Sequence, residues 1–159
     1  MLVILQGTRS IHNVGSIFRT ADAAGVEKIY LCGITPSPLD RFGNVRPQFS
    51  KVALGAEKSV AWEQCRSAIG LINKFKKEGY KILAVEQSPR SIPYYKYSAT
   101  TRHSRVALVL GNEIKGLSPA ILKKADRILE IPMRGAKESL NVAVAFGIVV
   151  FDLLFRHRS

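Results

Sequence analysis

Residues 106–118 decide the fold, and they read Val106-Ala107-Leu108-Val109-Leu110-Gly111-Asn112-Glu113-Ile114-Lys115-Gly116-Leu117-Ser118. The first five residues are apolar without alternation, which predicts a central parallel strand covered on both faces. A polar, glycine-containing segment follows directly. Ligands in open α/β sheets bind beyond the carboxyl ends of such strands. Glycine permits close backbone approach or positive φ, so a binding loop and a turn that uses glycine for geometry alone both fit this segment.

Outward from this stretch, short apolar runs alternate with helical patterns. We expect further strands at 2–5, 28–32, 80–85 and 127–131. Helices are expected at 14–24, with Asn13 as N-cap and Gly25 as the stop, and at 63–78, 119–125 and 139–155. Residues 33–56 and 86–104 read as irregular. Strands that alternate with helices predict an α/β fold, a mainly parallel sheet flanked by helices, in one domain over 1–159.

Two other strand-to-helix junctions carry polar side chains. In the first, Asn13 and Ser16 lie near a predicted helix N-terminus, a natural place for an anion, and Arg19 follows within an apolar stretch. Arg19 is either a site residue or a surface residue of a capped helix. In the second, residues 131–143, Asn141 lies early in an apolar helix. It is either a hydrogen bonder at the helix start or a site residue, because a buried unpartnered amide is costly.

The charge of the chain points to a polyanion. Lys and Arg number 24 against 12 acids, which gives a formal charge of +12. The balance favours a nucleic acid partner over a merely soluble basic protein. The 47% hydrophobic content excludes disorder over the whole chain. No signal peptide or membrane-length apolar run is present. The two cysteines, Cys32 and Cys65, are expected to be free, which fits a reducing, cytoplasmic location.

Several common catalytic signatures are absent from the sequence. We find no Gly-x-Gly-x-x-Gly, no P-loop and no Gly-x-Ser-x-Gly. The histidines His12, His103 and His157 lack the spacing of metal ligands, so no metal is expected.

The three junctions together resemble the SpoU (TrmH-like) family of SPOUT RNA 2′-O-methyltransferases. The motifs are residues 13–21 (NVGSIFRTA), residues 110–118 (LGNEIKGLS) and residues 131–142 (IPMRGAKESLNV). The resemblance spans residues 2–155, and three motifs in this order are highly specific. It implies a SPOUT-type sheet with a C-terminal deep trefoil knot, S-adenosylmethionine as cofactor, and a homodimer with the active site near the subunit interface. The apolar helix 140–155 would suit a dimer surface or burial within one subunit equally well.

The resemblance also implies roles for individual residues. The cofactor-binding residues would be Val85, Glu86, Leu110, Gly111, Asn112, Gly116, Ile131, Met133 and Leu140. The catalytic residues would be Arg19, Asn13, Glu113, Ser139 and Asn141. A guanidinium has a pKa of about 12.5 or above and is a poor base. We therefore expect Arg19 to position the ribose and phosphate and to stabilise developing alkoxide charge, with the other four as supports.

Basic residues outside the motifs are candidate RNA contacts. These are Arg41, Arg46, Lys51, Arg90, Lys96 and Arg102. The neighbouring Tyr94, Tyr95 and Tyr97 would either stack on an unpaired base or pack in the core. Many relatives have an extra N-terminal RNA-binding domain, and none is expected here, so the catalytic domain, its dimer partner or another protein would recognise RNA.

The substrate and the activity each have alternatives. The resemblance implies tRNA as the first substrate, with rRNA as the alternative. A base methyltransferase of the same superfamily and a degenerate RNA-binding protein without turnover are the rival activities. Many members carry Ser where this chain has Ala143, which removes one hydroxyl from the third motif.

Overall fold

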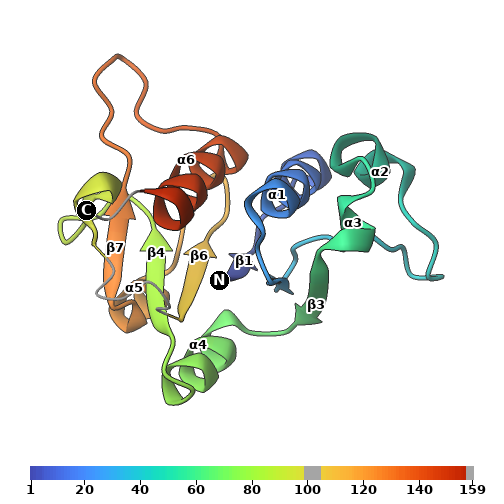
Figure 1. Cartoon of the computed structure of the whole chain (residues 1–159), viewed down its shortest axis with the longest axis horizontal. Coiled ribbons are helices and arrows are strands. Elements are labelled where there is room, and N and C mark those ends of the chain that lie inside the picture. The colour runs from blue at the N-terminus through green and yellow to red at the C-terminus, as the bar shows by residue number, and fades with distance from the viewer. Residues whose placement is uncertain (99–104, 157–159) are drawn as a thin grey trace.

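The computed structural model describes residues 1–98 and 105–156 of the 159. Within them, seven strands form one sheet in the order β3-β2-β1-β6-β4-β7-β5 (Figure 1). Every neighbouring pair is parallel, which confirms the predicted sheet. The strands are β1 Leu2–Gln6, β2 Lys28–Cys32, β3 Ala61–Cys65, β4 Lys81–Val85, β5 Ile92–Pro93, β6 Val106–Leu110 and β7 Arg127–Glu130.

Helices cover both faces of this sheet. They are α1 Ile11–Ala24, α2 Pro47–Ala53, α3 Ala56–Ser59, α4 Ala68–Lys77, α5 Pro119–Lys124 and α6 Val142–Phe155, with a 3₁₀ turn η1 at Tyr94–Lys96. α1, α2, α3 and α6 pack on the face that buries Val3 and Leu5. α4 and α5 pack on the opposite face, which buries Leu2 and Ile4. Successive strand residues thus pack alternately into two separate apolar layers, one on each face of the sheet.

β6 lies between β1 and β4 and is buried at every residue, as its unbroken apolar pattern predicts. Its carboxyl end at Leu110 therefore sits near the middle of the sheet edge. β4 ends beside β6 and β7 ends beside β4, so the polar segments that follow these three strands meet at one place.

The helix expected at 63–78 is wrong in its first five residues. Residues 61–65 form β3, which pairs with β2 and carries an ion pair of 2.7 Å between Lys28 and Glu63. Helix α4 begins at Ala68, after Ser67 accepts a hydrogen bond from the Gly70 amide. β3 is an exposed edge strand, so its polar residues gave no alternating apolar pattern.

Other boundaries also differ from the sequence expectation. Ser10, not Asn13, caps α1, so the helix starts three residues earlier and Asn13 lies inside it. α6 starts at Val142 with Asn141 as its cap, not at Ser139. The region 33–56, expected to be irregular, holds α2, which has Pro47 at its first position. β5 and η1 likewise lie within the region expected to be irregular at 86–104.

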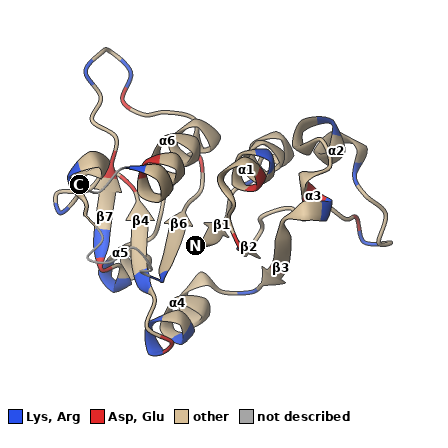
Figure 2. Ribbon diagram, viewed as in Figure 1, with Lys and Arg blue, Asp and Glu red and all other residues tan. Residues whose placement is uncertain are grey.

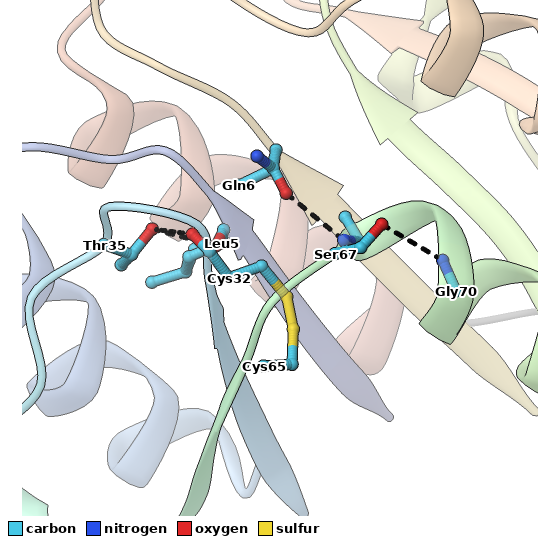
Figure 3. The surroundings of a disulfide bond; sticks show 8 residues. Leu5, Gln6, Cys32, Thr35, Cys65, Ser67 and Gly70 are labelled. Carbon is cyan, nitrogen blue, oxygen red and sulfur yellow. Dashed lines mark hydrogen bonds between the residues drawn. A yellow bond between two sulfur atoms is a disulfide. The ribbon is translucent and has the colours of Figure 1, made fainter.

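The two cysteines form a disulfide, so the expectation of free thiols is wrong. Cys32 ends β2 and Cys65 ends β3, and the parallel register places them directly opposite, with Cα atoms 4.7 Å apart. Figure 3 shows the bridge beside the hydrogen bond from the Ala68 amide to Gln6 and the bonds of the Thr35 hydroxyl to Leu5 and Cys32 carbonyls. The pairing removes the cysteine argument for a reducing compartment.

Candidate active site

A cavity of about 440 Å³ opens at the carboxyl ends of β4, β6 and β7. Its size is in the range of small-molecule sites. All nine residues expected to bind cofactor line it, together with four of the five expected catalytic residues. The lining includes Val85, Glu86, Leu110, Gly111, Asn112, Gly116, Ile131, Met133 and Leu140, and also Asn13, Glu113, Ser139 and Asn141.

Three side chains from the three motifs form one hydrogen-bonded chain at the cavity. The Asn13 side-chain amide donates to a Glu113 carboxylate oxygen at 3.2 Å. The Asn141 amide in turn donates to Asn13 Oδ1 at 2.9 Å. Asn141 Oδ1 accepts from the amides of Ala143 and Val144 and so caps α6. Asn141 therefore starts the helix, as one interpretation predicts, and it also lines the cavity.

Glu113 connects these hydrogen-bonded side chains to the start of α1. Its carboxylate accepts hydrogen bonds from the backbone amides of Arg9, at 3.0 and 3.2 Å, and of Ser10, at 3.0 Å. Partial burial pushes the pKa of Glu113 upward, but the hydrogen bonds from Arg9, Ser10 and Asn13 outweigh it and hold the pKa below its usual value. Glu113 is therefore a fixed anion and not a proton donor at neutral pH.

The loop between Gly111 and Gly116 is closed tightly around Asn112. The Asn112 side chain donates to the Gly7 carbonyl at 2.9 Å and accepts from the amides of Ile114 and Lys115. A Cβ at Gly111 would lie 2.6 Å from the Gly116 carbonyl carbon. Gly116 has φ of +64°, and a Cβ there would meet the Glu86 carboxylate. The glycines are thus required by geometry, in a loop that also lines the cavity.

The cavity is acidic although the chain is strongly basic. Among the described residues that line it, four are glutamates and none is Lys, Arg or His; the glutamates are Glu86, Glu113, Glu130 and Glu138. Apolar walls come from Val85, Leu110, Ile131 and Met133. Such a site favours a cation with an apolar body over a phosphate. S-adenosylmethionine carries a sulfonium and an ammonium group, so the residues present fit it.

Arg19 is the expected catalytic residue that the structure does not bring to the cavity. It lies on the exposed side of α1 and is not among the residues that line the cavity. α1 packs between α2 and α6, so Arg19 is carried on a helix next to α6 (Figure 1).

The expected RNA contacts are spread over several elements. The Arg41 guanidinium lies over the Phe42 ring at 4.7 Å, and Phe42 is 73% exposed. Arg46 Nε donates to the Ser37 and Leu39 carbonyls, which makes Arg46 a support of its own loop. Arg90 donates to the Leu122 carbonyl. Lys51 on α2 and Lys96 on η1 are exposed, and Arg102 lies outside the described residues.

The three tyrosines at and just after η1 differ in their exposure. Tyr94 and Tyr97 are half-buried and pack against the core, whereas Tyr95 is 46% exposed. The Arg156 guanidinium, which the sequence did not single out, donates to the backbone carbonyls of all three.

Sequence reasoning missed some residues that shape the cavity. The Gln87 side chain donates to the Glu138 carbonyl at 2.6 Å and ties the segment after β4 to the third motif. Glu130 at the end of β7 accepts from the Ser91 hydroxyl. Gln87 follows β4 and Glu130 ends β7, so their place at the carboxyl ends of strands could have identified both as candidates. Among the described residues, no group of three or more His, Cys, Asp or Glu side chains could hold a metal.

Comparison with known proteins identifies relatives over nearly the whole chain. Residues 1–151 match the model of the SpoU rRNA Methylase family. The chain is 31% identical over 152 residues to a tRNA (guanosine(18)-2′-O)-methyltransferase of Aquifex aeolicus, which covers 96% of this chain and 67% of that protein. It is 32% identical over 158 residues to a 23S rRNA (guanosine-2′-O-)-methyltransferase of Escherichia coli K12, with 99% and 60% covered.

A solved AdoMet-bound rRNA methyltransferase from Sinorhizobium meliloti superposes with a TM-score of 0.86 at 28% identity, covering 99% of this chain and 57% of that one. The chain thus spans about 57–67% of the length of these relatives.

Proposed function

Because the chain belongs to the SpoU rRNA methylase family, we propose that it transfers a methyl group from S-adenosylmethionine to a ribose 2′-hydroxyl of RNA. The observation that carries the proposal is the hydrogen-bonded chain Glu113–Asn13–Asn141, which joins all three motifs at one acidic cavity. A merely structural strand edge would not need these two bonds between residues 100 and 128 positions apart.

The cavity walls suit the cofactor. When bound, S-adenosylmethionine supplies an electrophilic methyl group and is left as a neutral thioether. Val85, Leu110, Ile131 and Met133 would exclude water around the reacting carbon. Glu86, Glu130 and Glu138 would attract the cationic groups, since charges interact strongly in a partly closed site.

Asn13 and Asn141 would hold the acceptor ribose in line with the methyl group. Their amides are fixed at 2.9 Å from one another, and Glu113 orients Asn13 from the other side. Alignment of two reactants supplies much of the rate of such a displacement. Ser139, which also lines the cavity, is a further hydroxyl toward the same ribose.

A homodimer would complete the site. The hydroxyl must lose a proton as it reacts, and a nearby guanidinium stabilises the charge that develops on oxygen. Arg19 lies away from the cavity of its own chain, so we assign this role to Arg19 of the partner subunit. α6 supports the pairing because it exposes apolar side chains: Val144, Phe151, Leu154 and Phe155 are 37–56% exposed.

The remaining features belong to the same proposal. Residues 1–159 would form one methyltransferase domain, and its C-terminal segment would form the trefoil knot that the family membership implies. The described part of the chain contains no helix long and apolar enough to cross a bilayer. Relatives that act on tRNA and 23S rRNA support a cytoplasmic location.

We favour tRNA as the substrate and keep rRNA as the alternative, since relatives of both kinds are equally similar. The test is transfer of labelled methyl from S-adenosylmethionine to total tRNA and, separately, to rRNA, followed by alkaline digestion. A 2′-O-methyl group protects the adjacent phosphodiester, so label in alkali-resistant dinucleotides is expected. Label only in mononucleotides would reassign the enzyme to base methylation. A lack of label in both pools, with cofactor bound, would favour a protein without turnover.

A further inference from the structure

A dense group of cations lies at the edge of the sheet opposite the cavity. We call it the amino-edge cluster, and it consists of Lys76, Lys77, Lys81, Arg105, Lys123, Lys124 and Arg127. The carboxylates among these positions are Glu78 and Asp126, so the net charge is +5, a large share of the +12 of the chain. Figure 2 shows these blue segments at the lower end of β4 and β7 and on α4.

The topology explains why these residues meet. Helices α4 and α5 run antiparallel to the strands that follow them, so their last turns lie beside the amino ends of β4, β6 and β7. Lys81 starts β4 and its backbone bonds to Arg105, which precedes β6. Arg127 starts β7, whose partner is β4. Residues from four elements and the residue before β6 thereby meet at one edge of the sheet.

Contacts with backbone carbonyls hold several of the cations in place. Arg105 donates to the Glu78 carbonyl, Arg127 to the Asp126 carbonyl and Lys76 to the Lys124 carbonyl. One bond leaves four of the five donors of a guanidinium for other acceptors. Lys77, Lys81 and Lys123 are exposed around them. Fixed guanidinium groups among exposed ammonium groups are the pattern that contacts phosphates in nucleic acid complexes.

The acidic cavity strengthens this assignment. None of the described residues that line the cavity is a cation that could attract a phosphate backbone, so we look for that attraction elsewhere on the surface. β4 and β6 have five residues each, so the cluster lies about 16 Å from the cavity edge along the strands. α4 and α5 also lie on the sheet face opposite α6, so the proposed dimer leaves the cluster exposed.

We propose that the amino-edge cluster binds the phosphate backbone of the RNA substrate at a segment remote from the methylated nucleotide. The proposal rests on the proposed function for the identity of the partner as RNA. Its contacts are to phosphates and not to bases, so they supply affinity and not the choice of nucleotide. The competing interpretation is that the cations only stabilise the carboxyl ends of α4 and α5 through the helix dipole.

The test compares two double variants that each remove two charges. Lys77→Gln/Lys123→Gln changes the cluster, and Lys58→Gln/Arg66→Gln changes exposed cations on α3 and before α4. Fluorescein-labelled total tRNA is titrated with each protein, without cofactor, at several salt concentrations. Loss of two phosphate contacts should lower the slope of log affinity against log salt by about 1.4–1.8 and weaken binding about 10- to 30-fold at 0.15 M salt.

The cluster variant should lose this affinity while thermal unfolding and S-adenosylmethionine affinity stay near wild type, and the control variant should bind as wild type does. Wild-type affinity and slope in the cluster variant would overturn the proposal, and so would an equal loss in the control. Methyl transfer is measured separately. RNA binding through the cluster without any methyl transfer would refute the proposed activity and leave the cluster assignment intact.

Discussion

Replacement of Asn13 by Asp puts a second carboxylate against Glu113 without a change of shape. In the wild type, the Asn13 amide donates to Glu113 at 3.2 Å and its oxygen accepts from Asn141 at 2.9 Å. The aspartate keeps the acceptor for Asn141. It also replaces the hydrogen bond to Glu113 by a repulsive contact between two carboxylates. Asn13 is only 9% exposed, so water screens this repulsion poorly.

The cost follows from the distance and the lost hydrogen bond. Two unit charges 3.2 Å apart repel by about 1–5 kcal/mol for effective dielectric constants between 80 and 20. A hydrogen bond to a charged group contributes about 1.5–3 kcal/mol. Because one carboxyl can escape by taking up a proton, we expect Asn13→Asp to lose about 3 kcal/mol of unfolding free energy at pH 8. That corresponds to a fall in Tm of about 6–12 °C for a chain of this size.

The pH dependence distinguishes charge from shape. In the folded variant the pKa of the carboxyl pair is raised above the unfolded values of about 4. A raised folded-state pKa contributes stability that is present below the unfolded pKa and is lost as pH rises through the folded one. The deficit relative to wild type should therefore shrink to about 1 kcal/mol at pH 5, where a shared proton restores a donor between the two groups.

Urea unfolding followed by the fluorescence of Trp62, the single tryptophan, measures this difference at pH 5 and pH 8. Asn13→Ala is the matched control, because it removes the link without adding a charge and its deficit should not depend on pH. A variant within 0.5 kcal/mol of wild type at pH 8, or an equal deficit at both pH values, would refute the assigned chain of contacts; about 0.5 kcal/mol is typical of surface changes.

Three other changes probe the site and the fold. Glu86→Gln keeps an oxygen for the Leu117 amide but removes a charge from the cavity. Calorimetry should therefore show a larger loss of affinity for S-adenosylmethionine than for its neutral thioether product. Equal losses of affinity would argue against an electrostatic role of Glu86. Arg19→Lys should lower methyl transfer at least about 10-fold with intact RNA binding, since loss of one donor to a developing oxyanion costs about 10²–10³-fold and lysine keeps part of that interaction. Near wild-type turnover would exclude a specific guanidinium role. Reduction of the disulfide between Cys32 and Cys65, which are 33 residues apart, should cost about 2–4 kcal/mol of unfolding free energy. Cofactor affinity should stay unchanged after reduction, because β1 separates β2 and β3 from the strands that line the cavity. If reduction leaves the unfolding curve unchanged, the disulfide does not form.

Much of the sheet could be predicted because its inner strands are apolar without interruption. β1, β2, β4, β6 and β7 are all recognisable from such runs, and the polar residues that follow three of them predicted the cavity. β3 could not be found in this way, since an edge strand that faces solvent carries the polar residues Glu63 and Gln64. Its residues also continued the helical pattern of α4 backward.

What the sequence could not predict is which groups meet in space. The disulfide depends on the register of β2 and β3, and no spacing along the chain encodes it. The contact of Asn13 with both Glu113 and Asn141 depends on a helix that starts at Ile11, three residues before the predicted start. Arg19 belongs to the first motif by sequence, yet it lies outside the cavity, which only the assembled fold reveals.

Ribose methylation by this protein can be measured by mass spectrometry of nucleosides from tRNA and rRNA that were treated with the protein and S-adenosylmethionine carrying a deuterated methyl group. We expect a labelled nucleoside whose ribose fragment carries the deuterium, formed by the wild type and lost in Asn141→Ala, because Asn141 joins the third motif to the rest of the site. Deuterium on a base fragment, or ribose labelling that Asn141→Ala leaves at the wild-type level, would contradict this expectation.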